Sequence, residues 1–330
     1  MRALTCKVFG PPADLEVSEL PDITPGPGKV LIRVDAVGVG YVDGLLIQGK
    51  YQIKPSLPFV PGNEFAGEII AQGEGVSSPK LGERVFGLAS GVFAEHIAVA
   101  SAGCYPVPSG LSSAEAAGLL LNYATALYGL DDCGKLRPAE SVLILGASGG
   151  VGSAAIAVAK ALGLQVIAAA STPEKVQAAK GFGADEGVCY GDPTWRDRLK
   201  EVLRGRSLDA VFDPVGGSIA EPALRSLSPG GRLLVVGFAG GPVPSIALNL
   251  VLLKRCSIVG VDWGGESRAD ASLTPRLARK LFALIESGKL APPPVVSRPL
   301  RQVREALTEQ LAGRIMGKLV IDMRGDWPRT

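Results

Sequence analysis

The chain has 330 residues, which is long enough for two domains that each bury a core of their own. Lys and Arg total 34 against 32 Asp and Glu, so the charge balance does not indicate nucleic acid or an acidic membrane as a partner. Although 47% of the residues are hydrophobic, polar residues or glycines interrupt the most apolar stretches before they reach membrane-spanning length, which argues against a membrane protein.

The chain begins with residues that predict a β-rich domain over positions 1–122. Short segments of alternating apolar and polar residues are separated by turns rich in proline and glycine, a pattern typical of a small barrel. The N-terminal run MRALTCKVFG has no apolar region with a cleavage site, and the five cysteines include no C-x-x-C pair, so we expect a cytoplasmic protein with reduced thiols. The strand-like segments are residues 1–9, 29–39, 65–72, 84–86 and 94–98.

Two helices are predicted to lead out of this domain. Ser112 and Glu115 form a capping box at the start of a helix over 114–121, and a second helix over 123–133 follows. From Ser141 onward strands and helices alternate, which predicts a doubly wound parallel sheet. The expected strands are 142–145, 165–170, 187–190, 208–213, 231–236 and 257–262, and the expected helices are 151–162, 173–182, 194–204 and 218–226.

The last part of the chain is predicted to return to the first domain. It contains helices over 274–287 and 301–311 and a final strand over 318–322. The expected fold class is therefore α/β, with one domain made of residues 1–122 and 265–330 and a second made of residues 123–264.

A glycine-rich turn joins the first strand of the parallel sheet to its helix. It has the pattern G-x-G-x-x-G with alanine in place of the first glycine. Gly149 lets a pyrophosphate approach the backbone, Gly152 lets the helix pack closely on the strand, and free N–H groups at the helix start bind phosphate. Because a strand precedes the turn and a helix follows it, dinucleotide binding is favoured over a turn without a ligand. The predicted contacts are Ala147, Ser148, Gly149, Gly150, Val151 and Gly152.

Segments along nearly the whole chain resemble the zinc-free, zeta-crystallin-like quinone oxidoreductases of the medium-chain dehydrogenase/reductase superfamily. The segments that carry the resemblance are PGPGKVLIRVDAVGVGYVDGLLIQGKY, LPFVPGNEFAGEI, GERV, AEAAGLLLNYATALYGL, VLILGASGGVG, DPVGG, SPGGRLLVVGFAGG and NLVLLK. The resemblance implies a GroES-like β-barrel catalytic domain, a Rossmann domain inserted within it, a homodimer and a pyridine-nucleotide oxidoreductase.

The residues at the positions of the superfamily's catalytic zinc predict that no metal is bound. Zinc-dependent relatives place a cysteine three residues before an aspartate and a histidine in a later Gly-His-Glu sequence. Here Gly40 precedes Asp43, and Asn63 lies between Gly62 and Glu64. Only Glu64 is left as a ligand, and a catalytic zinc needs three. Without a Lewis acid, the hydride acceptor must already be activated, as quinones and α,β-unsaturated carbonyl compounds are.

The residues after the second strand of the parallel sheet favour NADPH over NADH. Ala170 stands where an acidic residue would bind the ribose hydroxyls of NADH. Ser171 supplies a hydroxyl and Lys175 a positive charge for the 2′-phosphate of NADPH, and by resemblance Tyr190 contacts that phosphate too. The alternative interpretation makes Lys175 an exposed helix residue and Ser171 a helix N-cap, and the two interpretations are compatible.

The resemblance also implies which residues lie near the nicotinamide and the substrate. On the nicotinamide side these are Asn122, Thr125, Gly237, Phe238, Ala239, Trp263 and Gly264. On the substrate side the candidates are Tyr41, Tyr51 and Asn63, and a tyrosine hydroxyl there can bind the reduced oxygen or relay a proton. For Tyr41 and Tyr51 alike, a packing role in the core or at the surface is as compatible with the sequence as a catalytic role. Gly40 and Leu45 replace an asparagine and a tyrosine common in the family, which predicts a more open and more apolar pocket.

Three functions remain open at this point. The leading hypothesis is an NADPH-dependent reductase of quinones or other conjugated carbonyl compounds. The alternatives are a dedicated enoyl or alkenal reductase and an NADPH-binding protein with little turnover. A homodimer is expected through strand Ser257–Val261, because an uncovered sheet edge can pair with a second copy of the chain.

Overall fold

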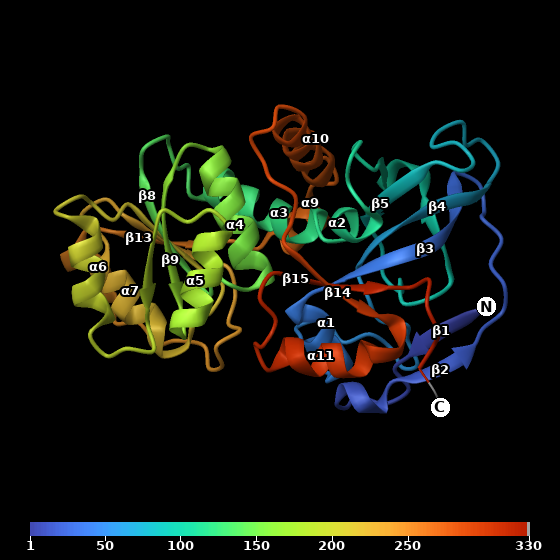
Figure 1. The fold of residues 1–330 in the computed structure, drawn as a ribbon, viewed down its shortest axis with the longest axis horizontal. Coiled ribbons are helices and arrows are strands. Elements are labelled where there is room, and N and C mark those ends of the chain that lie inside the picture. Colours follow the sequence, from blue (N-terminus) through green and yellow to red (C-terminus); the bar gives the residue numbers. More distant parts are fainter. Residues whose placement is uncertain (329–330) are drawn as a thin grey trace. The chain divides into compact units, whose positions relative to one another are not determined.

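The computed structural model describes residues 1–328 and divides the chain into two compact units (Figure 1). The first unit consists of Met1–Leu121 and Pro292–Thr330, and the second consists of Asn122–Ala291. This division differs from the predicted one, which assigned residues 265–291 to the first domain.

A helix explains why the second boundary lies later than predicted. Helix α10 (Leu273–Glu286) belongs to the second unit, where Arg276 pairs with Asp132 at 3.0 Å and Lys280 pairs with Asp131. These ion pairs join residues about 150 positions apart in sequence, a separation that no local pattern reveals.

The first unit is built around the long strand β3. A sheet with the order β14-β15-β3-β4-β5-β7 runs through it, and β6 also pairs with β3. The first half of β3 pairs with β6 and its second half with the C-terminal strand β15, so the end of the chain completes this sheet. The strands are β1 (Arg2–Thr5), β2 (Glu16–Glu19), β3 (Lys29–Val39), β4 (Glu64–Gln72), β5 (Arg84–Leu88), β6 (His96–Ala100), β7 (Cys104–Pro106), β14 (Val295–Pro299) and β15 (Lys318–Asp322).

The α-helices in the described part of this unit are α1 (Tyr41–Ile47), α2 (Ser113–Ala117) and α11 (Val303–Leu311). The predicted capping box is confirmed, because Glu115 N–H donates to Ser112 Oγ at 3.2 Å and Ser112 N–H donates to Glu115 Oε2 at 2.8 Å. The helix predicted over 114–121 is nevertheless wrong at its end. It stops at Gly118, where a Cβ atom would lie only 3.0 Å from the Lys318 side chain.

The connection to the second unit also differs from the prediction. Instead of one helix over 123–133, α3 (Leu120–Leu127) is followed by a π-helical turn over Tyr128–Cys133. Buried apolar residues occur both in α3 and in the π-helical turn. The hydrophobic pattern is therefore continuous across the change in helical pitch and does not predict it.

The second unit contains a six-stranded parallel sheet with the order β10-β9-β8-β11-β12-β13 (Figure 1). This is the doubly wound Rossmann order that the alternation of elements predicted. The strands are β8 (Ser141–Leu145), β9 (Gln165–Ala170), β10 (Glu186–Cys189), β11 (Ala210–Asp213), β12 (Arg232–Val235) and β13 (Ser257–Gly260). The further helices are α4 (Gly150–Ala161), α5 (Pro173–Gly181), α6 (Trp195–Leu203), α7 (Ala220–Ser226), α8 (Leu248–Lys254) and α9 (Trp263–Ala269).

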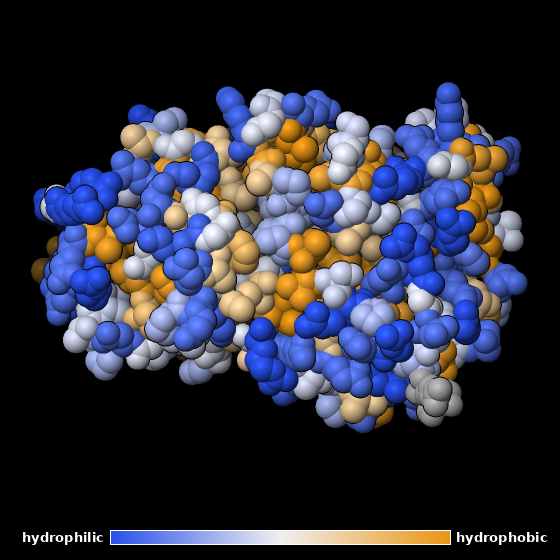
Figure 2. Space-filling view, viewed as in Figure 1, coloured by the Kyte–Doolittle hydropathy of each residue, from blue (hydrophilic) through white to orange (hydrophobic). Residues whose placement is uncertain are grey.

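Each unit has its own hydrophobic core. In the first, side chains of β3, β4 and β5 pack with Phe93 and with α11. In the second, alternate residues of the parallel strands pack against α6, α7 and α8. Hydrophilic side chains cover much of the face of the protein seen in Figure 2.

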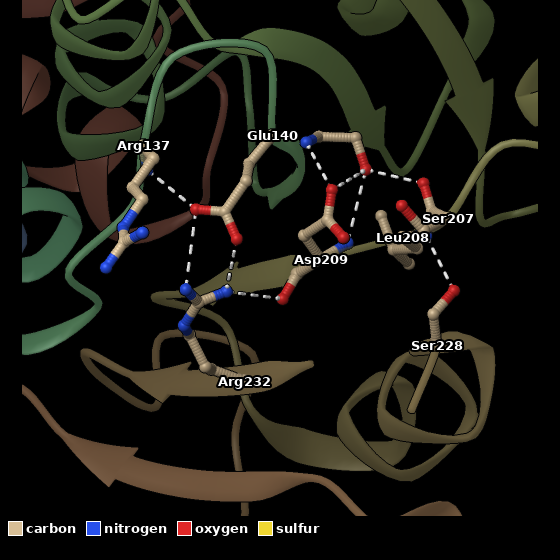
Figure 3. Close-up of polar contacts among 8 residues, drawn as sticks. Arg137, Glu140, Ser207, Leu208, Asp209, Ser228 and Arg232 are labelled. Carbon is tan, nitrogen blue, oxygen red and sulfur yellow. Dashed lines mark hydrogen bonds and ion pairs between the residues drawn. The ribbon is translucent and has the colours of Figure 1, made fainter. Parts of the chain in front are cut away.

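A polar network fastens the amino ends of the central strands in the second unit (Figure 3). Glu140 accepts from the Arg232 guanidinium at 2.9 Å, and Asp209 accepts from Ser141 N–H at 2.8 Å. Ser228 Oγ accepts from the backbone N–H of Leu208 at 2.9 Å. These contacts tie together the amino ends of β8, β11 and β12, whereas open α/β sheets bind ligands at the opposite, carboxyl edge.

Candidate functional site

The glycine turn after β8 has the geometry of an anion site. Helix α4 begins at Gly150, one residue earlier than predicted, and its N-cap residue Gly149 has no side chain to cap the first turn. The N–H groups of the first helical residues therefore lack intrahelical and side-chain acceptors, and the helix dipole adds a partial positive charge there. The turn can bind a phosphate through backbone N–H groups.

The roles predicted for Gly149 and Gly152 can be distinguished by the atoms that an added Cβ atom would contact at each position. At Gly152 a Cβ atom would lie 2.2 Å from the carbonyl oxygen of Gly146, so only glycine allows the helix to approach the strand. At Gly149 a Cβ atom would meet only that same oxygen, at 3.4 Å, which is ordinary contact. Packing within the protein thus demands glycine at 152 but not at 149, where the close approach of a ligand stays a prediction.

A second polar cluster follows β9, where the structure brings together Ser171, Lys175 and Tyr190. Lys175 Nζ donates to Ser171 Oγ at 3.3 Å, and the Tyr190 hydroxyl lies close to Ser171. Burial raises the pKa of Tyr190, and the neighbouring Ser171 side chain opposes that rise. Within residues 1–328 Lys175 forms no ion pair, so its charge is available to an anion. The helix N-cap is Thr172, not Ser171, because the Thr172 hydroxyl accepts from Lys175 N–H.

The loops after β11 and β12 are tied together at the carboxyl edge of the sheet. Gly237 N–H donates to the Asp213 carbonyl at 3.2 Å, and Ala239 N–H donates to the Pro214 carbonyl at 3.1 Å. Beside them the ring of Phe238 is partly exposed and lies against Gly216, where a Cβ would come within 2.7 Å of it. The predicted group Gly237, Phe238 and Ala239 therefore lies at the edge where open α/β sheets bind ligands.

Asp213 is a further residue of this edge that sequence reasoning missed. Its buried carboxylate accepts from the N–H groups of Val215 and Gly216, both at 2.8 Å. Burial raises the pKa of Asp213, and the two N–H donors lower it. The DPVGG segment carried the signal, since a carboxylate at a strand end followed by a glycine turn is typical of a loop-holding role.

The other predicted nicotinamide residues lie on α3 and α9. Asn122 and Thr125 are three residues apart on α3, so they share one face of that helix. Trp263 and Gly264 begin α9, which Asp262 caps by accepting from Gly265 N–H at 2.8 Å. The indole N–H of Trp263 is buried with no acceptor among residues 1–328. It is an unpaired donor beside the carboxyl edge of the sheet.

In the first unit the structure joins Asn63 to Asp43. Asn63 Nδ2 donates to Asp43 Oδ1 at 2.7 Å, and Gly40 N–H donates to Asp43 Oδ2 at 2.7 Å. Asp43 is 1% exposed and Asn63 is half-buried. Burial raises the pKa of Asp43, while its two N–H donors lower it.

Next to Asn63, Glu64 forms a buried ion pair. Glu64 is 0% and Lys318 is 2% exposed, and Lys318 Nζ lies 2.8 Å from Glu64 Oε2. The other carboxylate oxygen of Glu64 accepts from Leu121 N–H at 2.9 Å. Burial raises the pKa of Glu64, and the Lys318 charge opposes the rise. The pair links β4 to the C-terminal strand β15, and sequence reasoning did not single out Lys318.

The two candidate tyrosines are placed differently. Tyr41 is the first residue of α1, two positions before Asp43, and Tyr51 lies in the turn region after that helix. Both are half-buried, and neither hydroxyl is hydrogen-bonded within the part of the chain that the structure describes. The structure thus connects Asn63 to the α1 segment through Asp43, and among residues 1–328 no hydrogen bond joins the Tyr51 side chain to either.

The donor set here does not fit a catalytic zinc ion. Among residues 1–328 no three His, Cys, Asp or Glu side chains are placed to hold a metal. The oxygens of Asp43 and Glu64 are engaged by N–H donors and by Lys318, and the flanking Gly40 and Asn63 add no strong ligand.

No helix in the described part of the chain is both long and apolar enough to cross a membrane. Two family models match the chain: the alcohol dehydrogenase GroES-like domain over residues 26–109 and the zinc-binding dehydrogenase domain over residues 150–279. They fall on the β-rich unit and on the unit with the parallel sheet, respectively.

Individual relatives are similar over almost the full chain. A quinone oxidoreductase-like protein 2 homolog from Nematostella vectensis is 34% identical, covering 98% of this chain and 89% of that protein. The structure of Escherichia coli quinone oxidoreductase complexed with NADPH is 26% identical with a TM-score of 0.86, covering 98% of this chain and 100% of the other. The CurK enoyl reductase structure is also 26% identical, with a TM-score of 0.88 and coverage of 97% and 98%. The chain thus belongs to the quinone oxidoreductase family of the medium-chain dehydrogenases/reductases, and it is an oxidoreductase.

Proposed function

We propose that the protein transfers hydride from NADPH to quinones or other conjugated carbonyl acceptors without a metal ion. The observation that carries the cofactor choice is the cluster of Ser171, Lys175 and Tyr190 beside Ala170. It offers a free cation and hydroxyl groups where an NADH-specific site has a carboxylate. The E. coli relative with NADPH bound supports the same choice.

In this proposal NADPH supplies the hydride, and the chain binds and orients the reactants. The N–H groups at the start of α4 hold the pyrophosphate, and the cluster at Lys175 holds the 2′-phosphate. The loop at Phe238 and the start of α9 at Trp263 bound the nicotinamide end. Asn63 and the tyrosines of the first unit are the candidates for contact with the acceptor oxygen.

The absence of metal rests on the donor set of Asp43 and Glu64, whose oxygens already have partners. A conjugated acceptor does not need a Lewis acid, because it delocalises the charge that arrives with hydride. The proposal places the reaction in the cytoplasm, where the five free thiols of this chain would stay reduced.

The test is to follow the loss of NADPH absorbance with a panel of quinones, alkenals and enoyl thioesters. We expect turnover with at least one conjugated acceptor, at a rate that added chelator does not change. Tight NADPH binding without oxidation by any acceptor would instead support an NADPH-binding protein with little turnover.

A dedicated enoyl or alkenal reductase is the second candidate. Gly40 and Leu45 are smaller or less polar than the asparagine and tyrosine common at these positions, and both are partly exposed. The CurK enoyl reductase has the same fold over nearly the full chain. A preference for enoyl thioesters over quinones in the acceptor panel would favour this candidate.

The glycine turn gives a matched pair of variants. Gly149→Ala is expected to leave the unfolding temperature unchanged, since its Cβ would meet only the Gly146 carbonyl oxygen at 3.4 Å, but to weaken NADPH binding at least several-fold, because the pyrophosphate is proposed to approach the backbone there. Gly152→Ala should lower the unfolding temperature as well, because its Cβ would overlap the carbonyl oxygen of Gly146. Thermal unfolding and fluorescence titration with NADPH measure the two effects, and equal losses of stability in both variants would contradict this assignment.

We also propose a homodimer formed through the β13 edge of the parallel sheet. β13 is the last strand of the sheet, and Ile258 on it is 41% exposed. Helix α8 precedes it, and three of its leucines, Leu248, Leu252 and Leu253, are 80%, 76% and 72% exposed. An unpaired strand beside exposed leucines is a surface that a second copy would cover.

Leu252→Asp is therefore expected to produce a monomer. Light scattering after size-exclusion chromatography measures the mass, and the Leu81→Asp variant, with a 63% exposed leucine in the first unit, serves as the control. A wild-type protein that is monomeric at micromolar concentration would refute the proposed dimer.

A further inference from the structure

Asp43 is a buried carboxylate that the proposed reaction has not used. It is 1% exposed, and among residues 1–328 it forms no ion pair with a Lys, Arg or His side chain. Two N–H donors contact its carboxylate, Gly40 N–H on Oδ2 and Asn63 Nδ2 on Oδ1, each at 2.7 Å, and the nearby charge of Lys318 also favours the ionised form. Burial of a charge costs stability, which suggests that the contacts of Asp43 have a role besides packing.

The two donors lie at the adjoining ends of two paired strands. Gly40 follows the last residue of β3, Asn63 precedes the first residue of β4, and Gly38 is paired with Glu64 in the register of these strands. Asp43 lies on the first turn of α1, and its two hydrogen bonds therefore hold together the end of β3 and the start of β4. Asn63 is half-buried, so the residue is not fully enclosed by the protein.

Asp43 also determines which way the Asn63 amide is oriented. An ionised carboxylate accepts hydrogen bonds and cannot donate, so the amide must turn Nδ2, and not Oδ1, toward Asp43. One of the two Nδ2 hydrogens is then used by Asp43 Oδ1. The second hydrogen stays available as a donor for another oxygen.

We propose that Asp43 is a positioning residue that holds the Asn63 amide so that its second N–H binds the oxygen of the hydride acceptor. This inference rests on the proposed function. The acceptor oxygen gains negative charge when hydride arrives, and a donor fixed in advance stabilises that charge without having to reorganise. Asp43 itself does not touch the acceptor, and it acts through Asn63.

The experiment compares four proteins: the wild type, Asp43→Asn, Asn63→Ala and the exchanged pair Asp43→Asn with Asn63→Asp. In Asp43→Asn the new amide can accept from Gly40 N–H and turn its own Nδ2 toward residue 63, which it matches only if the Asn63 amide flips to present Oδ1, so residue 43 no longer holds Nδ2 of Asn63 in its wild-type orientation. In the exchanged pair, residue 43 accepts from Gly40 N–H and donates to residue 63, so each lost hydrogen bond is replaced. The exchanged pair, however, presents a carboxylate instead of an N–H to the acceptor.

We expect kcat/KM for the acceptor to fall about tenfold or more in Asn63→Ala and in Asp43→Asn, which corresponds to the loss of one hydrogen bond to a developing charge. The Kd for NADPH should be unchanged, because the predicted contacts of NADPH with the turn and the Lys175 cluster lie in the second unit. In the exchanged pair the unfolding temperature should return to near the wild-type value while kcat/KM stays low.

Recovery of kcat/KM together with stability in the exchanged pair would overturn the proposal, since it would show a purely structural role for Asp43. Wild-type kcat/KM in Asn63→Ala would overturn it as well. If Asp43→Asn fails to fold, the exchanged pair and Asn63→Ala still decide the question. Failure of the proposed function itself would be visible separately, as a wild-type protein that oxidises NADPH with none of the acceptors.

Discussion

Replacement of Lys318 by methionine is expected to destabilise the protein by about 3–5 kcal/mol, the cost of leaving a buried charge without its partner. Lys318 is 2% exposed and lies 2.8 Å from Glu64, which is itself fully buried. Methionine fills a similar volume but removes the positive charge, so Glu64 keeps only the Leu121 N–H as a partner. Urea unfolding followed by circular dichroism measures the change in the transition midpoint.

An exposed ion pair with a similar distance between its charged atoms provides the control. Lys7 Nζ lies 2.7 Å from Glu16, and the two side chains are 54% and 55% exposed. Lys7→Met should cost less than about 1 kcal/mol, because water and salt screen that pair. The double variant Glu64→Gln with Lys318→Met should recover most of the lost stability, since no buried charge remains. Equal effects of Lys7→Met and Lys318→Met would contradict the assignment.

The pH dependence of Lys318→Met has a definite sign. Burial raises the pKa of Glu64, and in this variant the main group that opposes the rise is gone. A carboxyl whose pKa is raised by folding binds its proton more tightly in the folded state than in the unfolded state, so the folded state loses stability as the pH rises above the unfolded value. The deficit of Lys318→Met relative to wild type should therefore shrink toward acidic pH and grow toward neutral pH.

The parallel sheet and the glycine turn after its first strand could be predicted because their signals are local. The apolar strand 142–145, the glycine run and the helix that follows fall within twenty residues, and steric demands at Gly152 restrict the residue type directly. The cluster at Ser171 and Lys175 is local in the same sense, because one helical turn separates the two residues.

The buried charges of the first unit could not be predicted, because their partners are distant in sequence. Lys318 and Glu64 meet only through the pairing of β15 with β3 and of β3 with β4. The period of a strand shows which side a residue faces, but it does not show which strand lies beside it. The contact of Asp43 with Asn63 spans twenty positions. The resemblance had singled out Asn63 as a substrate-side candidate at the position of a zinc-ligating histidine, but it used Asp43 only as a reference position and gave no sign that the two side chains meet.

The end of the second unit was predicted after residue 264 and lies after Ala291, and the reason is related. Residues 265–291 have no strand, and an amphipathic helix such as α10 fits either unit as far as its sequence pattern shows. The structure decides the question through long-range ion pairs of Arg276 and Lys280 with the Asp131–Asp132 pair.

Lys175→Ala is expected to weaken NADPH binding about 10- to 100-fold and to leave NADH binding nearly unchanged. A charge-assisted hydrogen bond contributes about 1.5–3 kcal/mol, and each 1.4 kcal/mol is tenfold in affinity. Lys175 is placed for such a bond, because it is held by Ser171 Oγ at 3.3 Å and has no competing carboxylate partner among residues 1–328. NADH lacks the 2′-phosphate, so it loses little when the charge is removed. Fluorescence titration of both cofactors measures Kd without depending on turnover.

Lys180→Ala is the matched control, because Lys180 lies on the same helix α5 but is exposed and outside the cluster with Ser171 and Tyr190. It should change neither affinity. Equal weakening of NADPH and NADH in Lys175→Ala would mean that the lysine supports the fold of α5 and not cofactor selection. A selective loss of NADPH affinity with an unchanged unfolding temperature would show that the charge of Lys175 discriminates between the two cofactors. Ala170 beside it leaves that charge unopposed, because no acidic residue stands there to repel the 2′-phosphate.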